Sequence, residues 1–243
     1  MIIDEKNISE EVQWHAESLA NRVIKALKKN CFDAEYVTNR HEALARVLEL
    51  IPSKGTIGCG ESVTLDQIGF NDWLMVQKEH EVFSHRLRQP SDFSSPDLHR
   101  DWCFEIHRKA LTSDAFVTGT NAITLEGKLV NMDGDGNRVA AMIYGPKRVI
   151  IIAGINKIVR DVDEAIRRIH EYTAPINNRR HVVKHNFDIV SKLPCVLTGT
   201  CNHCRSDNRS CHITTIIDGW SPGAKGSAQL PPYVIIVGET LGI

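Results

Sequence analysis

Four cysteines lie close together near the end of the chain and could jointly hold a metal. Their spacing is Cys195-x5-Cys201-x2-Cys204-x6-Cys211, and its Cys-x2-Cys step can turn two thiolates toward one ion. Four thiolates suit either a tetrahedral zinc or a 4Fe–4S cluster. The spacing matches neither a zinc ribbon nor a bacterial ferredoxin, but four ligands in one compact stretch favour a 4Fe–4S cluster wrapped by a single loop. Zinc and four unliganded cysteines are the alternatives.

A glycine-rich turn could bind an anionic ligand. Two glycines, Gly58 and Gly60, end a predicted strand, and two hydroxyls, Ser62 and Thr64, stand where a helix should begin. Ligands of open α/β sheets bind beyond the carboxyl ends of strands, where free N–H groups attract anions. The segment is not a P-loop, because it lacks Gly-Lys-Ser/Thr. A tight turn with a serine cap is the structural alternative.

A second polar segment follows another predicted strand. Arg138 could clamp a carboxylate or phosphate through two hydrogen bonds, and Glu126 could act as nucleophile or general base if it is partly buried. Hairpin turns at Glu126-Gly127 and Asp135-Gly136 are the structural alternative. We therefore take Glu126 and Arg138 as catalytic candidates. The ligand-binding candidates are Gly58, Gly60, Ser62, Thr64, Gly119, Thr120, Asn121 and Asn137.

Alternating strands and helices must position these loops. Apolar periodicity predicts helices over residues 9–30, 39–51, 97–111 and 161–172, and strands over 34–38, 56–60, 80–83, 114–120 and 149–153. This order predicts an α/β domain over residues 1–175, with a mostly parallel sheet flanked by helices. Residues 176–243, which hold the cysteines and two short strands over 213–217 and 233–237, are expected to form a small Cys-rich appendage.

Composition excludes several classes of protein. The 243 residues carry 29 Lys and Arg against 30 Asp and Glu, a net charge of -1 that argues against non-specific nucleic-acid binding. Hydrophobic content of 42% excludes a disordered or collagen-like chain. No stretch approaches the roughly 18–20 apolar residues of a membrane-spanning helix. The acidic, polar N-terminus is not a signal peptide, so a cytoplasmic protein is expected.

Several segments together resemble the family of lactate-utilization (LUD) domain proteins. They are Thr56–Gly69, Asp114–Asn131, Asp133 with Gly136-Asn-Arg138, and Val149–Val159. The resemblance implies the fold shared by glucosamine-phosphate isomerase, ribose-phosphate isomerase and CoA transferases. It implies a role near the oxidation of L-lactate or a related organic acid, beside iron–sulfur partners. Among CoA transferases a glutamate attacks the acyl-CoA, and Glu126 is the position we compare with it. Longer family members carry a similar Cys-rich tail, which favours iron–sulfur over zinc.

Two functions stay open at this point. The first is an enzyme or enzyme subunit of organic-acid metabolism that binds an anionic small molecule at the loops around Gly58–Thr64 and Gly119–Arg138. The second is a non-enzymatic assembly or regulatory subunit for iron–sulfur protein partners, because no obvious nucleophile–base pair is visible in the sequence. A zinc-stapled protein that binds an acyl group or a phosphosugar is a third reading. In each case we expect a homo-oligomer.

Overall fold

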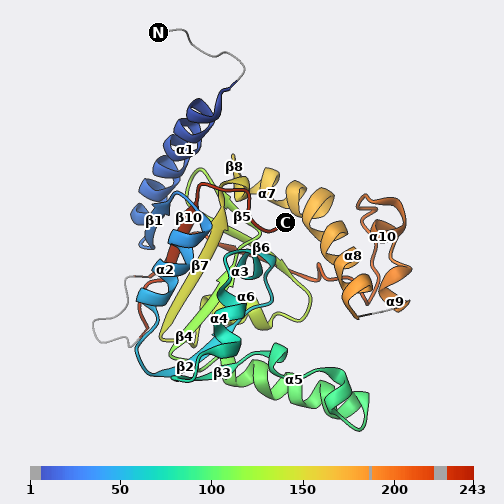
Figure 1. Ribbon diagram of the computed structural model, residues 1–243. Coiled ribbons are helices and arrows are strands. Elements are labelled where there is room, and N and C mark those ends of the chain that lie inside the picture. The colour runs from blue at the N-terminus through green and yellow to red at the C-terminus, as the bar shows by residue number, and fades with distance from the viewer. Residues whose placement is uncertain (1–6, 186–187, 222–228) are drawn as a thin grey trace.

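A six-stranded parallel sheet lies at the centre of the molecule (Figure 1). The computed structural model describes residues 7–185, 188–221 and 229–243. The strand order is β1 (Asp33–Val37), β10 (Tyr233–Val237), β7 (Arg148–Gly154), β4 (Ala115–Gly119), β2 (Gly55–Cys59) and β3 (His80–Phe83), and every neighbouring pair is parallel. The predicted α/β class with a mostly parallel sheet is confirmed.

The central strands are apolar on both faces because helices cover both faces. In β7, Val149, Ile151 and Ala153 enter one hydrophobic core, whereas Ile150 and Ile152 enter the other. Side chains of a strand alternate between the two faces of its sheet, so a strand with two covered faces becomes a continuous apolar run. This explains why residues 149–153 show no polar alternation in the sequence.

Six helices form the two outer layers (Figure 1). The helices α1 (Ser9–Lys29), α5 (Pro96–Ala110) and α6 (Asn137–Ile143) supply one core, and α2 (Arg40–Leu50), α3 (Val63–Gln67) and α4 (Phe70–Val76) supply the other. Local capping explains where two of them begin. The side chain of Asn39 accepts hydrogen bonds at the start of α2, and that of Ser95 does so at the start of α5. None of the described helices is both long and apolar enough to cross a membrane.

A second sheet of four strands lies beside the first. Its order is β8 (Ile158–Val159), β5 (Ala122–Thr124), β6 (Leu129–Asp133) and β9 (Ile213–Ile217), and α7 (Val162–Arg168) packs against it. The antiparallel pair β5–β6 is the hairpin predicted at Glu126-Gly127. Gly127 has φ +79° there, a left-handed conformation that glycine adopts without strain.

The strands after residue 175 require a correction to the expected domain division. Strand β10 lies between β1 and β7 in the central sheet, and β9 pairs with β6. The expected boundary at residue 175 therefore does not separate two domains, because strands on its C-terminal side belong to both sheets. Three helices, α8 (Ala174–His185), α9 (Asp188–Ser191) and α10 (Pro194–Thr198), lie outside the sheets and contact one another (Figure 1).

Candidate functional site

A pocket of about 570 Å³ lies at the carboxyl edge of the central sheet, and we call it the carboxyl-edge pocket. Three neighbouring strands deliver side chains to it: Ser62 follows β2, Asn121 follows β4 and Lys157 follows β7. This is where parallel α/β sheets bind ligands. Seven predicted residues line it, namely Ser62, Thr64, Gly119, Thr120, Asn121, Asn137 and Arg138.

The predicted glycines act through close packing. A Cβ on Gly60 would lie 3.1 Å from Cδ of Arg138, and one on Gly119 would lie 2.7 Å from Oγ of Ser62. Gly58 lies deeper, where a Cβ would meet Ala110 at 2.9 Å. The missing side chains of Gly60 and Gly119 allow the two loops and Arg138 to approach one another. Of the three predicted glycines, Gly119 lines the pocket, and Gly58 and Gly60 do not.

The structure does not bring Glu126 to this pocket. Its side chain is 74% exposed in the β5–β6 turn, 3.8 Å from the amine of Lys128. Its backbone oxygen accepts a hydrogen bond from Asn30, at the end of α1. A carboxylate exposed to water on a hairpin turn has no neighbouring groups that would activate it as a nucleophile or base. Glu126 is therefore a residue of the hairpin turn, and we do not include it in the site.

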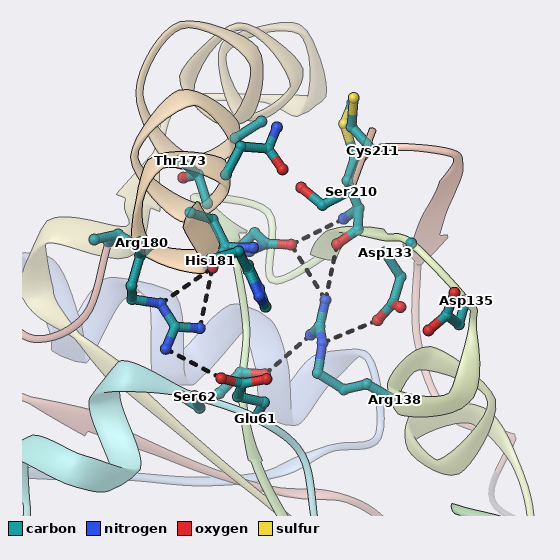
Figure 2. A pocket seen from close by; sticks show the side chains of 18 of the residues that line it. Glu61, Ser62, Asp133, Asp135, Arg138, Thr173, Arg180, His181, Ser210 and Cys211 are labelled. Carbon is teal, nitrogen blue, oxygen red and sulfur yellow. Dashed lines mark hydrogen bonds and ion pairs between the residues drawn. The ribbon is translucent and has the colours of Figure 1, made fainter. Parts of the chain in front are cut away.

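Arg138 is in the pocket wall, but the protein itself occupies its donors (Figure 2). Its side chain is 13% exposed and forms an ion pair of 3.1 Å from Nε to Asp133. The two terminal nitrogens donate to Asn131 Oδ1 at 2.8 Å, the backbone oxygens of Met132 at 3.0 Å and Gly119 at 3.3 Å, and Asn121 Oδ1 at 3.3 Å.

These contacts change the role expected for Arg138. A guanidinium has five N–H donors, and here protein acceptors surround all three nitrogens. Arg138 therefore ties the end of β4 to β6 and shapes the pocket. A bidentate grip on a ligand would require it to release these partners, so we treat it as a positioning residue.

Glu61 is a functional candidate that the sequence reasoning missed. It lies between Gly60 and Ser62, and its Oε1 is 2.7 Å from Nζ of Lys184 and 3.1 Å from a terminal nitrogen of Arg180. Both partners belong to α8, which Figure 2 shows above the turn that carries Glu61. Glu61 thus fastens α8 over the pocket. A carboxylate two residues after a buried strand was the available signal.

The environment keeps Glu61 ionised. Burial by itself raises the pKa of Glu61, but the hydrogen bond and charge of Lys184, together with Arg180, outweigh burial and hold the pKa well below its usual range. His85 lies on the other side, with Nε2 3.7 Å from Glu61 Oε2. Burial lowers the pKa of His85 to about 4, so this imidazole is neutral at pH 7.

Replacing Glu61 with glutamine is expected to lower the free energy of unfolding at pH 7 by about 1–2 kcal/mol, allowing for the partial exposure of Lys184. Since folding lowers the pKa of Glu61 from its ordinary 4.5, its contribution is complete above pH 4.5 and is lost as the pH falls below it. Urea unfolding at pH 7 and pH 3.5 should therefore show that the free energy of unfolding falls more between these two pH values for the wild type than for Glu61→Gln.

The matched control is Glu105→Gln, which removes an exposed carboxylate paired with Arg108 at 3.0 Å. It should leave both the stability and its pH dependence nearly unchanged. A Glu61→Gln chain with wild-type stability at pH 7 would show that the ion pairs to α8 contribute nothing.

The four predicted metal ligands line a second pocket of about 420 Å³, which we call the cysteine pocket. Cys195 is in α10, Cys201 and Cys204 follow it, and Cys211 precedes β9. All four are free thiols, and burial raises the pKa of the Cys211 thiol. The cysteine spacing therefore predicted which side chains gather in this pocket.

Neighbouring groups around the thiols are suited to an anionic occupant. Asn178 donates to Sγ of Cys195 at 3.4 Å, and the backbone N–H of His203 donates to Sγ of Cys201 at 3.4 Å. His170, which the sequence analysis did not single out, lies 3.4 Å from Cys201 Sγ in the π-helical turn η4 (Ile169–Thr173). Arg209 lines the same pocket, and its buried Nε finds no hydrogen-bond partner among the described residues.

All four clustered thiols line the cysteine pocket. Within the described part of the chain, no three Cys, His, Asp or Glu side chains are grouped closely enough to hold a single metal ion. The donor set and the unpaired Arg209 donor fit an anionic iron–sulfur cluster.

The family model of the LUD domain matches residues 20–226, which is most of the chain. The chain belongs to the LUD-domain family. The match runs past the expected boundary at residue 175 and includes the loops of the carboxyl-edge pocket and all four clustered cysteines. The resemblance inferred from the sequence is thereby confirmed, and with it a lactate-utilization type of function at the level of the family.

The solved structures found to be similar to the chain are distant from it in sequence. A DUF162 family protein from Deinococcus radiodurans is 15% identical, with a TM-score of 0.45, and the match covers 92% of this LUD-domain chain and 98% of that one. Ribose 5-phosphate isomerase A from Neisseria gonorrhoeae is 11% identical, with a TM-score of 0.30 over 59% of this chain and 64% of that one.

A D-ribose-5-phosphate isomerase in complex with phospho-erythronic acid is 14% identical, with a TM-score of 0.30 over 51% of this chain and 54% of that one. No curated protein matches the chain.

Proposed function

We propose that this LUD-domain protein binds a small organic acid of the lactate type in the carboxyl-edge pocket and holds an iron–sulfur cluster in the cysteine pocket. One observation carries the proposal: the two pockets share a wall. Cys211, Arg209, Asp207, His212, Ala174 and Asn178 line both of them. A ligand in the first pocket would therefore lie beside the thiols of the second.

The carboxyl-edge pocket offers donors suited to a carboxylate. Ser62 stands before α3 without capping it, so its hydroxyl is not used by the helix. Asn121 follows β4, and Lys157, whose amine also contacts Ile243, follows β7. Several hydroxyl, amide and amine donors on three neighbouring strands can hold a small anion in one orientation.

The cysteine pocket would hold the cluster through Cys195, Cys201, Cys204 and Cys211, with Arg209 as its counter-ion. A cluster bound there would supply one-electron transfer. The residues of this chain keep the two pockets adjacent: Asn178 of α8 lines both and donates to Cys195, while Glu61 fastens α8.

Thermal-shift assays and calorimetry with L-lactate and pyruvate test the organic-acid proposal. We expect both ligands to stabilise the anaerobically purified protein, because a ligand at about 100 times its Kd stabilises the native state by about 2.7 kcal/mol. Ribose 5-phosphate and CoA serve as comparison ligands. Stabilisation by either of these, with none by lactate or pyruvate, would contradict the proposal.

A serine variant links the binding to the pocket. Ser62→Ala removes a hydroxyl from the pocket wall and should weaken lactate binding by about 1 kcal/mol, or about fivefold. The matched control Ser91→Ala changes an exposed serine of the 3-10 turn Pro90–Asp92, outside the pocket, and should bind as the wild type does. Equal affinities in all three proteins would place the ligand elsewhere.

A further inference from the structure

Arg180 is an arginine of the carboxyl-edge pocket whose donors are only partly used. It belongs to α8 and reaches toward the turn that carries Glu61 (Figure 2). One terminal nitrogen lies 3.1 Å from Glu61 Oε1, while Nε and the other terminal nitrogen share Asn177 Oδ1, at 3.4 and 3.2 Å. These contacts with described residues use at most three of the five N–H donors of a guanidinium, and the others are left for a ligand.

The charge around Arg180 is positive in sum. Arg180 and Lys184 share one carboxylate, that of Glu61, and neither pairs with any other carboxylate of the described residues. Glu61 is ionised at pH 7, and His85 beside it is neutral. The side chains of Arg180 and Glu61 are only 24% and 22% exposed, so water screens the surplus positive charge weakly. An anionic ligand is therefore attracted to this side of the pocket.

Arg138, also in the pocket wall, has no such surplus. Asp133 neutralises it, and protein acceptors surround its three nitrogens. Figure 2 shows Asp133 and Asp135 on the far side of Arg138 from Arg180, so these carboxylates do not compensate the charge on α8. Of these two arginines, Arg180 is the one with donors available to a ligand.

The place of Arg180 limits the length of the ligand. Ser62, one of the groups proposed to hold the carboxylate of a lactate-type acid, follows Glu61 directly in the chain, and neighbouring Cα atoms lie about 3.8 Å apart. Since Glu61 contacts Arg180, a ligand that reaches from Ser62 to Arg180 needs only a few carbon atoms. The cavity of about 570 Å³ is as large as pockets that hold drug-sized ligands, so a group beyond the three carbons of lactate has room.

We propose that Arg180 binds a second carboxylate of the organic acid, an inference that rests on the proposed organic-acid function. The preferred ligand is then a short dicarboxylate with a 2-hydroxy or 2-oxo group. Ser62 and Asn121 hold the carboxylate that lactate also has, and Arg180 donates its remaining N–H groups to the additional one. Lys184 stays paired with Glu61 and keeps α8 over the pocket.

Calorimetry with malate and lactate tests this role, since malate is lactate with one carboxylate added to its methyl group. Malate should bind to the wild type at least about tenfold more tightly than lactate at pH 7, the usual effect of a hydrogen bond to a charged group. Arg180→Gln should abolish this preference and leave the affinity for lactate unchanged. The matched control Arg179→Gln changes the neighbouring exposed arginine, which lines neither pocket, and should keep the preference.

The two acids separate failure of this role from failure of the proposed function. Equal affinities for malate and lactate in the wild type would overturn the role of Arg180 and leave the organic-acid site intact. Equal losses of affinity for both acids in Arg180→Gln would overturn it as well, because Arg180 would then hold the carboxylate that they share. Absence of binding by either acid would overturn both proposals.

A second variant keeps the test decisive if Arg180→Gln does not fold. Arg180→Lys keeps the positive charge beside Glu61 but lacks the planar fork of N–H donors, so it should fold and bind malate with a smaller preference over lactate than the wild type has. Far-UV circular dichroism checks the fold of each variant. An undiminished preference for malate in a folded Arg180→Lys protein would overturn the two-donor contact.

Discussion

Replacing Arg138 with alanine is expected to lower the free energy of unfolding by about 3–5 kcal/mol, the usual cost of leaving one charge of a buried pair without its partner. The partner is Asp133, whose side chain is 10% exposed. The same change removes the donors to Asn131 and to two backbone oxygens. Urea unfolding followed by far-UV circular dichroism measures the loss.

The control for this variant is Arg108→Ala. Arg108 forms an ion pair of 3.0 Å with Glu105 on the surface of α5, where both side chains are more than half exposed. Its loss should change stability by less than about 1 kcal/mol. An Arg138→Ala protein that is as stable as the wild type but has lower affinity for the organic acid would contradict the positioning role. It would support the expectation from the sequence that Arg138 binds the ligand directly.

Replacing Cys204 with serine is expected to abolish the iron–sulfur cluster that we propose for the cysteine pocket. Cys204 supplies half of the Cys-x2-Cys step and lines the cysteine pocket with the other three thiols. A serine hydroxyl is a poor ligand for iron, so the iron content of anaerobically purified protein should fall from about four per chain to below one. Iron and acid-labile sulfide assays, with the visible absorption of the cluster, provide the measurement.

Cys31→Ser is the matched control. Cys31 is exposed in the turn after α1 and lines neither pocket, so its replacement should leave iron and sulfide at wild-type levels. Equal metal content in the Cys204→Ser and wild-type proteins would exclude Cys204 as a ligand. Zinc in place of iron and sulfide in the wild type would favour the zinc alternative.

The order of strands and helices was predictable from the sequence because it depends on local apolar periodicity. Strand β7 and helix α2 begin and end within a residue or two of their predicted bounds. The place of β10 was not predictable in the same way. Its residues 233–237 read as a strand, but pairing with β1 and β7 depends on contacts with residues far away in the chain.

The pocket was predictable in outline and its chemistry was not. Loops after parallel strands must meet at one edge, which is why Ser62 and Asn121 share a pocket. Whether a side chain is available there depends on its neighbours. Arg138 proved to be surrounded by acceptors, and Glu126 proved to be exposed.

We propose that the organic-acid site and the cysteine site form one functional unit through the wall that contains Cys211. Titrating the anaerobic protein with pyruvate while recording the visible circular dichroism of the cluster tests this claim most directly. We predict a saturable change with a midpoint equal to the calorimetric Kd. Pyruvate binding that leaves the cluster spectrum unchanged would contradict the claim.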